Sequence, residues 1–275
     1  MKKSPIAFIL LLAVSCGATV KPDEPQKGSG LPEPGGLKVS IQSNIAVLTE
    51  KIAAEPSNTA LLVERGDEYF MSGELDKSLA DFESAMKQTP SDPAVFCSAG
   101  EVYLALADYA QAKKLFQSAI EADGAFHKAY YFLGLTAMIV KDYSESLKNY
   151  NQAIALDKTQ PAYYLDRAQL YILTGKYKLA TADYSVFISI SPKQTLGYMK
   201  RGEAYLLAKE YGKALDDFDK VLGMDPEYDE AYIGKGKAYL GLGLPNEAQA
   251  SFMDAKALGN PEAAKLLEQM KKEGK

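Results

Sequence analysis

The amino-acid sequence predicts an all-α protein built as a solenoid of six helical hairpins. Three observations predict this class. From Thr59 to Glu262 the 275-residue chain repeats every 34 residues, six times, without insertion or deletion. Each repeat carries two stretches in which apolar residues recur at the three- and four-residue spacing of one helix face. Glycines fall between the stretches, where a helix must end. One hairpin cannot cover its own apolar face, but stacked neighbours can.

A short apolar leader precedes the repeats. Two lysines are followed by nine apolar residues from Ile6 to Val14, fewer than the roughly 20 that a transmembrane helix needs, so residues 1–15 are expected to be a signal peptide. The ending Ala-Val-Ser-Cys16 resembles the lipobox of bacterial lipoproteins, in which cleavage before the cysteine accompanies acylation of its thiol. We expect lipidation at Cys16. Because Ala13 stands where the commonest lipobox has Leu, an ordinary signal peptide with an incidental cysteine is the alternative.

Residues 16–36 are expected to form a flexible tether. Gly17 to Gly36 contain four Pro and five Gly and almost no bulky apolar side chain, a composition that cannot build a core. As a coil, this segment would span about 25 Å. In enteric bacteria, Asp after the lipid-bearing Cys favours the inner membrane. Gly17 lacks that signal, so the resemblance implies an extracytoplasmic lipoprotein, at the outer membrane if the organism is Gram-negative.

Two capping segments flank the six repeats. Residues 37–58 contain a helical pattern from Val39 to Ala54 that fits half a repeat, and residues 263–275 contain most of a polar-faced closing helix, Pro261 to Lys272, and a tail. The repeats themselves span 59–92, 93–126, 127–160, 161–194, 195–228 and 229–262.

The repeat columns resemble the tetratricopeptide repeat, with a large residue at position 4, Gly at 8, Tyr at 11, Ala at 20 and an aromatic residue at 24. Position 8 reads Gly66, Gly100, Gly134, Ala168, Gly202, Gly236. Position 24 reads Phe82, Phe116, Tyr150, Tyr184, Phe218, Phe252. The departures are Tyr or Phe for Trp at position 4, Arg or Lys for Leu at position 7, and the loss of Pro at position 32 in three repeats. The resemblance implies a right-handed α-solenoid without a cofactor.

Composition argues against several function classes. The chain has 31 Lys and Arg against 36 Asp and Glu, a net charge of −5, with one His and two Cys. Only three arginines occur, Arg65, Arg167 and Arg201, so no basic cluster is available to bind nucleic acid. Two cysteines and one histidine are too few for a zinc site, and we expect no metal.

No catalytic constellation can be assembled. His127 lies at a repeat junction and is expected to be an exposed loop residue rather than a general base. The glycines between Gly234 and Gly243 lack the spacing of a phosphate-binding loop. Asp216, Asp217 and Asp219 are interpreted as a solvated helix face, and Cys97 as a small apolar residue. The protein is predicted not to be an enzyme.

A second stripe on each first helix, at positions 2, 5, 9, 12 and 13, lines the concave groove in the resembled family. We predict that positions 5 and 9 bind a partner: Val63, Asp67, Cys97, Glu101, Tyr131, Leu135, Leu165, Gln169, Met199, Glu203, Ile233 and Lys237. The stripe is more apolar than solvent exposure would explain. Packing between neighbouring first helices is the alternative explanation.

This groove would suit an apolar or amphipathic protein segment with flanking Lys or Arg. It lacks the Lys and Asn residues with which chaperone-tail binders clamp a carboxylate. The expected function is therefore a membrane-anchored, non-enzymatic adaptor in the bacterial cell envelope. A small-ligand-binding accessory of an envelope transporter is the main alternative, and a scaffold that recruits a hydrolase is a third.

Overall fold

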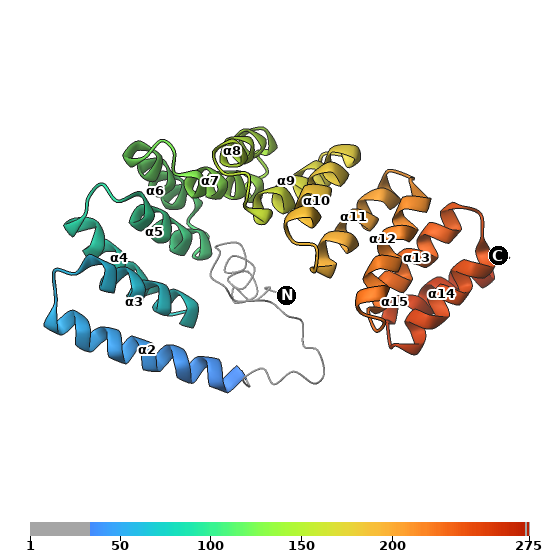
Figure 1. The fold of residues 1–275 in the computed structure, drawn as a ribbon, viewed down its shortest axis with the longest axis horizontal. Helices are drawn as coiled ribbons and strands as arrows, with labels where there is room; N and C mark the ends of the chain where they lie inside the picture. Colours follow the sequence, from blue (N-terminus) through green and yellow to red (C-terminus); the bar gives the residue numbers. More distant parts are fainter. Residues whose placement is uncertain (1–33, 273, 275) are drawn as a thin grey trace. The chain divides into compact units, whose positions relative to one another are not determined.

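In a computed structural model, the described residues, 34–272 and 274, form fourteen α-helices and no strand (Figure 1). The prediction of an all-α solenoid fold is confirmed. The expected signal peptide, Cys16 and the tether up to residue 33 lie outside the described residues. The helices are α2 Pro34–Ala54, α3 Thr59–Ser72, α4 Leu75–Gln88, α5 Pro93–Ala105, α6 Tyr109–Ala122, α7 His127–Ile139, α8 Tyr143–Leu156, α9 Pro161–Leu173, α10 Tyr177–Ile190, α11 Thr195–Leu207, α12 Tyr211–Met224, α13 Asp229–Gly241, α14 Pro245–Ala257 and α15 Pro261–Lys272.

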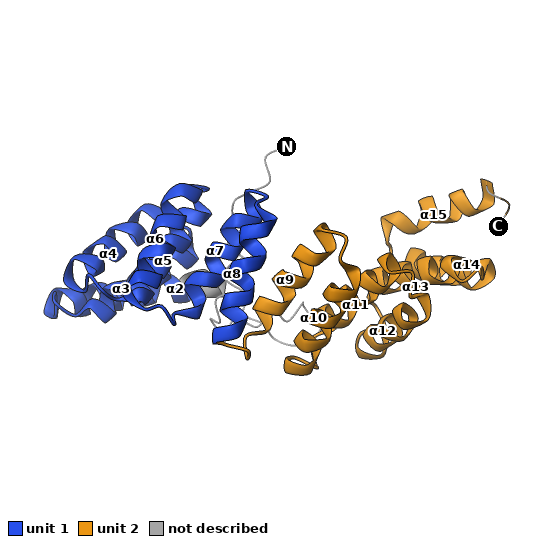
Figure 2. Ribbon diagram, turned by 90° about the horizontal axis from the view of Figure 1, so that it is seen from above, with its two compact units in different colours: residues 1–156 blue, residues 157–275 orange. Residues whose placement is uncertain are grey.

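The chain divides into two compact units, residues 1–156 and 157–275 (Figure 2). Unit 1 contains helices α2 to α8, and unit 2 contains α9 to α15. Within each unit, consecutive helices pack as antiparallel pairs, and the second helix of one repeat also contacts the first helix of the next. Helix α2 begins at Pro34 rather than at Val39; a proline is tolerated in the first turn because its missing N–H has no partner there.

The contact between the two helices of a repeat depends on glycine at position 8. A Cβ atom on Gly66 would lie 2.8 Å from the Phe82 ring, and one on Gly202 would lie 2.8 Å from the Phe218 ring. The aromatic residue at position 24 therefore occupies the space that a larger side chain at position 8 would need. This explains the two sequence columns together, because each ring needs its facing glycine or alanine.

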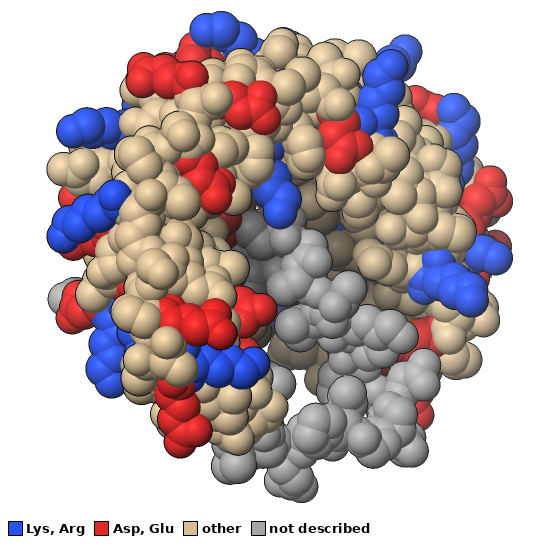
Figure 3. All heavy atoms as spheres, turned by 60° about the vertical axis from the view of Figure 1, so that its left-hand side comes forward, with Lys and Arg blue, Asp and Glu red and all other residues tan. Residues whose placement is uncertain are grey.

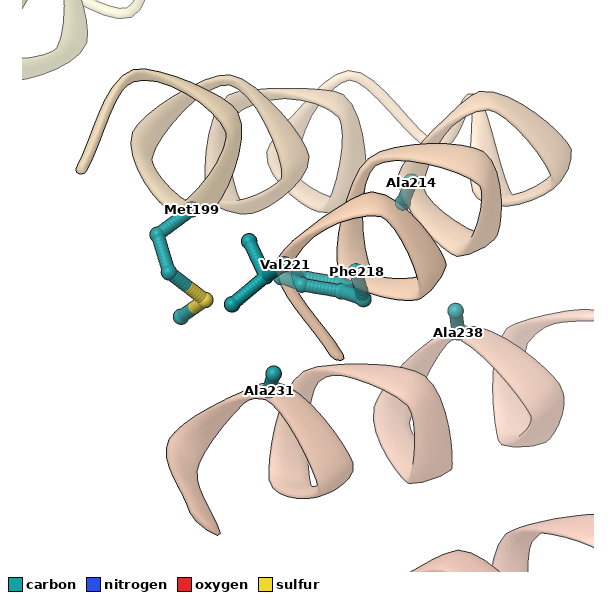
Figure 4. Packing of buried hydrophobic residues seen from close by; sticks show 6 residues of the cluster. All are labelled: Met199, Ala214, Phe218, Val221, Ala231 and Ala238. Atoms are coloured by element: carbon teal, nitrogen blue, oxygen red, sulfur yellow. The ribbon is translucent and has the colours of Figure 1, made fainter. Parts of the chain in front are cut away.

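Figure 4 shows how such a ring joins three helices in unit 2. Phe218 and Val221 of α12 lie between Met199 of α11 and Ala231 of α13, and all four side chains are buried. Small residues on the neighbouring helices, such as Ala238, allow this close approach. The second helix therefore fixes the distance between successive first helices.

The turn inside each hairpin adopts the left-handed backbone conformation at repeat position 15. Gly73, Gly175 and Gly243 have φ of 80°, 71° and 75°, as the glycine placement predicts. The other three repeats adopt it with Ala107, Lys141 and Lys209, at φ of 61°, 65° and 59°. Side chains are disfavoured in this region, so these three turns carry strain that the glycine turns do not.

Candidate partner-binding face

The predicted face is formed by positions 5 and 9 of successive first helices, α3, α5 and α7 in unit 1 and α9, α11 and α13 in unit 2. We call it the first-helix face. Its two rows, position 5 and position 9, differ in how deeply their side chains are buried in each unit.

The position 5 row lies in the packing between helices. Cys97, Tyr131, Met199 and Ile233 are buried, and Val63 and Leu165 are half-buried. Met199 belongs to the cluster around Phe218, and Ile233 to the cluster around Phe252. This row therefore stabilises the stack, and its binding role stays a prediction.

The position 9 row is more accessible. Asp67, Gln169 and Lys237 are exposed and Glu101 and Glu203 half-buried, whereas Leu135 is buried. In unit 2 the charged members have partners: Lys200 Nζ lies 2.9 Å from a Glu203 carboxylate oxygen, and Lys237 Nζ lies 2.9 Å from Glu262 of α15. Such exposed pairs are weak, so a ligand could replace them.

The face in unit 1 is acidic on its first two helices. Desolvation raises the pKa of the Asp67 carboxyl, although the residue keeps part of its surface exposed. The negative charges of Glu68 and Glu64 raise this pKa further, and the positive charge of Lys128 of α7 lowers it. Asp67 is thus a negative group next to apolar neighbours, and an added cation would stabilise its charged form.

A network of arginine, aspartate and tyrosine holds the first helices in place, and sequence reasoning missed it. Arg65, Arg167 and Arg201, all at position 7, each form two hydrogen bonds of 2.7–2.8 Å to the aspartate at position 23 of the same repeat. The aspartates are Asp81, Asp183 and Asp217, and all three are buried.

Tyrosines complete this network. In unit 2 the Arg201 guanidinium carbon lies 5.9 Å from the ring centroids of both Tyr198 and Tyr205, within the range of a cation–π contact. The third guanidinium nitrogen of Arg201, Nη1, donates a hydrogen bond of 2.9 Å to Ser185 Oγ of the preceding repeat. Hydrogen bonds with Asp217 raise the pKa of Arg201 further above its usual value.

The interpretation of Asp217 as part of a solvated face is wrong. Asp216 and Asp219 are exposed, but Asp217 is buried against Arg201. The sequence did contain the signal: Arg at position 7 occurs in the same three repeats as Asp at position 23. A bidentate pair needs both partners, so their joint occurrence indicates contact.

The residues considered for chemistry have structural roles. Gly234 and Gly236 lie inside α13, where the rings of Phe218 and Phe252 fill the space beside them, so this glycine-rich segment is a helix and not a phosphate loop. His127 begins α7 and is half-buried, with its ring stacked on Phe126 at 6.4 Å, rather than an exposed loop residue. Burial raises the pKa of the Cys97 thiol well above its usual value.

The part of the chain that the structure describes contains neither a metal site nor a membrane-spanning helix. No group of three or more His, Cys, Asp or Glu side chains in the range 34–272 is arranged to hold a metal ion. None of the helices α2 to α15 is long and apolar enough to cross a bilayer.

On the side of the molecule seen in Figure 3, acidic and basic side chains alternate over a largely uncharged surface.

Comparison with known structures supports the fold. The C-terminal part of a tetratricopeptide repeat-containing protein from Cytophaga hutchinsonii is 17% identical, with a TM-score of 0.65 over 82% of this chain and 96% of that one. PilW, a type IV pilus biogenesis factor, is 18% identical, with a TM-score of 0.64 over 76% and 98%. YrrB, described as having an unusual peptide-binding site, is 20% identical, with a TM-score of 0.53 over 68% and 97%.

Sequence comparison identifies the repeats. No curated protein matches the sequence. Two family models, both described as tetratricopeptide repeat, match residues 97–161 and 205–270. Together with the helical hairpins and their glycine–aromatic contacts, these matches confirm the resemblance in the repeat columns: the chain contains tetratricopeptide repeats.

Proposed function

We propose that this protein is a non-enzymatic, membrane-tethered adaptor of the bacterial cell envelope that binds a partner polypeptide on its first-helix face. The observation that carries the proposal is the division of that face into two rows. Position 5 fills the packing between first helices, so the helices within each unit are held in a fixed array. Most of position 9 stays accessible above it. A fixed array of accessible side chains is suited to recognition, because little ordering is needed on binding.

The chemistry of the face favours a partner with basic and apolar residues. In unit 1, Asp67 and Glu101 lie on neighbouring first helices, beside the half-buried apolar side chains of Val63 and Met71. An amphipathic or extended apolar segment with flanking Lys or Arg would be complementary to this surface in both charge and hydrophobicity. YrrB, which shares the fold, is described as having a peptide-binding site, and this adds support for a polypeptide ligand.

The membrane tether is proposed from the sequence. The short apolar leader, the lipobox-like ending at Cys16 and the Pro- and Gly-rich segment after it are the features of a lipoprotein whose domain is held away from the bilayer. Two or more acyl chains give stable anchoring, whereas one is marginal.

The anchor is tested by Cys16→Ser in the native host. We expect loss of metabolic palmitate labelling and release of the protein from the membrane fraction, with Cys97→Ser as the matched control that keeps both. Unchanged labelling in Cys16→Ser would exclude lipidation at this residue.

The face is tested from exposed positions, because Tyr131 and Met199 are buried and their substitution would unfold the repeats. A photo-crosslinking residue at Gln169 in cells should capture a discrete polypeptide, and the same residue at Met253, which is 56% exposed on a second helix, should not. Glu203→Lys, at position 9 of the next first helix of the same unit, should weaken capture without changing the helical circular dichroism. Equal capture from positions 169 and 253 would refute the assigned face, and capture of a small molecule alone would favour the transporter-accessory alternative.

A further inference from the structure

The turns that join first to second helices in unit 2 share an unusual surface. We define the basic turn edge as residues 173–179, 207–213 and 241–247. Five large apolar side chains on it are 39–53% exposed: Leu173, Leu179, Leu207, Leu242 and Leu244. They are half of the exposed large apolar residues that unit 2 contains among its described residues. Water-exposed leucines in such number on one edge indicate a surface that is covered in use.

The packing of unit 2 places these turns side by side. The end of α10, at Phe187 and Ile188, meets the start of α11 at Gly197. Because the two helices pack along each other, the start of α10 at Tyr177 lies at the end of α11, near Leu207. In the next pair, the Tyr211 ring at the start of α12 contacts Gly241 at the end of α13. The three turns therefore form one continuous edge.

The same edge carries positive charge in a protein that is acidic overall. Its lysines are Lys176, Lys178, Lys209 and Lys213, and its acids are Glu210 and Glu247. Lys213 pairs with Glu210 at 2.5 Å, while Lys176, Lys178 and Lys209 are exposed and form no ion pair with any residue of the described chain.

Part of the opposite edge of unit 2 is acidic. The turn before α13 contains Asp225 and Glu227, and the first turn of α13 contains Asp229 and Glu230. In unit 1 the turns equivalent to the basic turn edge carry more acidic than basic residues. Exposed apolar residues and a lysine also occur in the unit 1 turns, at Leu106, Val140 and Lys141. Among the described residues, however, the turns of unit 2 are the ones that combine five exposed leucines with an excess of lysine over acidic residues.

We propose that the basic turn edge contacts the surface of a bilayer that contains anionic lipids. Exposed leucines insert at the level of the headgroups, and half-buried tyrosines such as Tyr177 and Tyr211 suit the interface between water and acyl chains. The unpaired lysines lie beside them and neutralise lipid phosphates. This contact is separate from the proposed acylation of Cys16. Leu173 and Leu207 occupy repeat position 13 at the end of their first helices, so the edge adjoins the first-helix face of unit 2 without including its positions 5 and 9.

The chain contains no tryptophan, so a single introduced one reports its own surroundings. In the full-length chain, Leu173→Trp and Leu207→Trp should each shift their emission to the blue when vesicles of phosphatidylglycerol and phosphatidylcholine are added. Met253→Trp, equally exposed but on a second helix of the same unit, should not shift. Pure phosphatidylcholine vesicles or high salt should reduce the shift.

Charge is tested on the Leu173→Trp chain, by titrating vesicles against the emission shift. Lys176→Gln with Lys178→Gln should weaken the apparent affinity roughly 25-fold, since each lysine near an anionic surface contributes about a factor of five. Lys193→Gln with Lys220→Gln, two exposed lysines of unit 2 outside the edge, should leave it within about twofold.

Three results would overturn the proposal: no emission shift at positions 173 and 207, an equal shift at position 253, or equal losses from the two lysine pairs. A shift that appears only with an added protein, and not with vesicles, would assign the edge to a protein partner instead and would also refute a membrane contact.

Discussion

The Arg201–Asp217 pair allows a quantitative test of what holds the hairpins of unit 2 together. Asp217 has 6% of its side chain exposed and Arg201 21%, and two hydrogen bonds of 2.7 and 2.8 Å join them. Removal of one partner from a buried pair leaves an unpaired charge, at a cost of about 3–5 kcal/mol when burial is complete. Because Arg201 keeps some access to water, we expect Asp217→Ala to lower the free energy of unfolding by about 3 kcal/mol. For a chain of this size the melting temperature should fall by roughly 6–12 °C.

A matched control exists one repeat away. Lys235 also occupies position 7, and its Nζ lies 2.6 Å from an Asp219 carboxylate oxygen, but the Asp219 side chain is 56% exposed. An exposed pair contributes about 0–1 kcal/mol, so Asp219→Ala should shift the melting temperature by no more than about 3 °C. Both variants remove one acidic partner from a residue at position 7, and they differ mainly in burial.

The double variant Arg201→Ala with Asp217→Leu separates lost attraction from unpaired charge. Repeat 2 has Ala99 and Leu115 at these positions, so the fold accepts an apolar pair there. We expect the double variant to unfold at a higher temperature than Asp217→Ala, as seen by circular dichroism and by hydrogen exchange of α11 and α12. If Asp217→Ala and Asp219→Ala had equal effects, or if the double variant were the least stable, the role assigned to the network would be wrong.

Three further tests concern the packing. Gly202→Ala should lower the free energy of unfolding by about 1–3 kcal/mol in urea titrations, because its Cβ would lie 2.8 Å from the Phe218 ring. Gly212→Ala, with no atom within 4 Å, should be neutral or stabilising, and equal effects of the two variants would contradict the glycine–ring argument. Lys141→Gly should stabilise the protein by about 1 kcal/mol, because Lys141 has φ of 65°, and Gly175→Ala should show the opposite sign. Cys97 should react with iodoacetamide at pH 8 only in denaturant, because burial raises the pKa of its thiol and blocks access; prompt labelling of the folded Cys16→Ser chain would contradict this.

The fold could be predicted from the sequence because each repeat column has a local cause. Gly at position 8 and an aromatic residue at 24 describe one contact, and six copies of the pattern leave no doubt about its period. The left-handed turns were predictable at Gly73, Gly175 and Gly243 for the same reason. They were not predictable at Ala107, Lys141 and Lys209, because the rest of the hairpin imposes that conformation on residues that do not prefer it.

The site was predictable only in part, because a residue's burial depends on which neighbours pack over it. Cys97 and Val63 share position 5, yet Cys97 is buried and Val63 half-buried. Likewise, Leu135 is buried at position 9, where Gln169 is exposed. Treating position 7 as a mere departure from Leu hid the arginine–aspartate pairs, although correlation between columns 7 and 23 was present in the sequence.

This burial pattern changes which residues can determine partner choice. A ligand on the first-helix face would meet position 9 directly and position 5 only through the exposed parts of Val63 and Leu165. Position 5 therefore contributes mainly to the packing between neighbouring helices. Asp67 and Glu101 in unit 1, against Gln169, Glu203 and Lys237 in unit 2, differ in charge between units that share one fold. Since the scaffold is common to both, we expect any difference in partner choice between the units to follow the charges of the position 9 row.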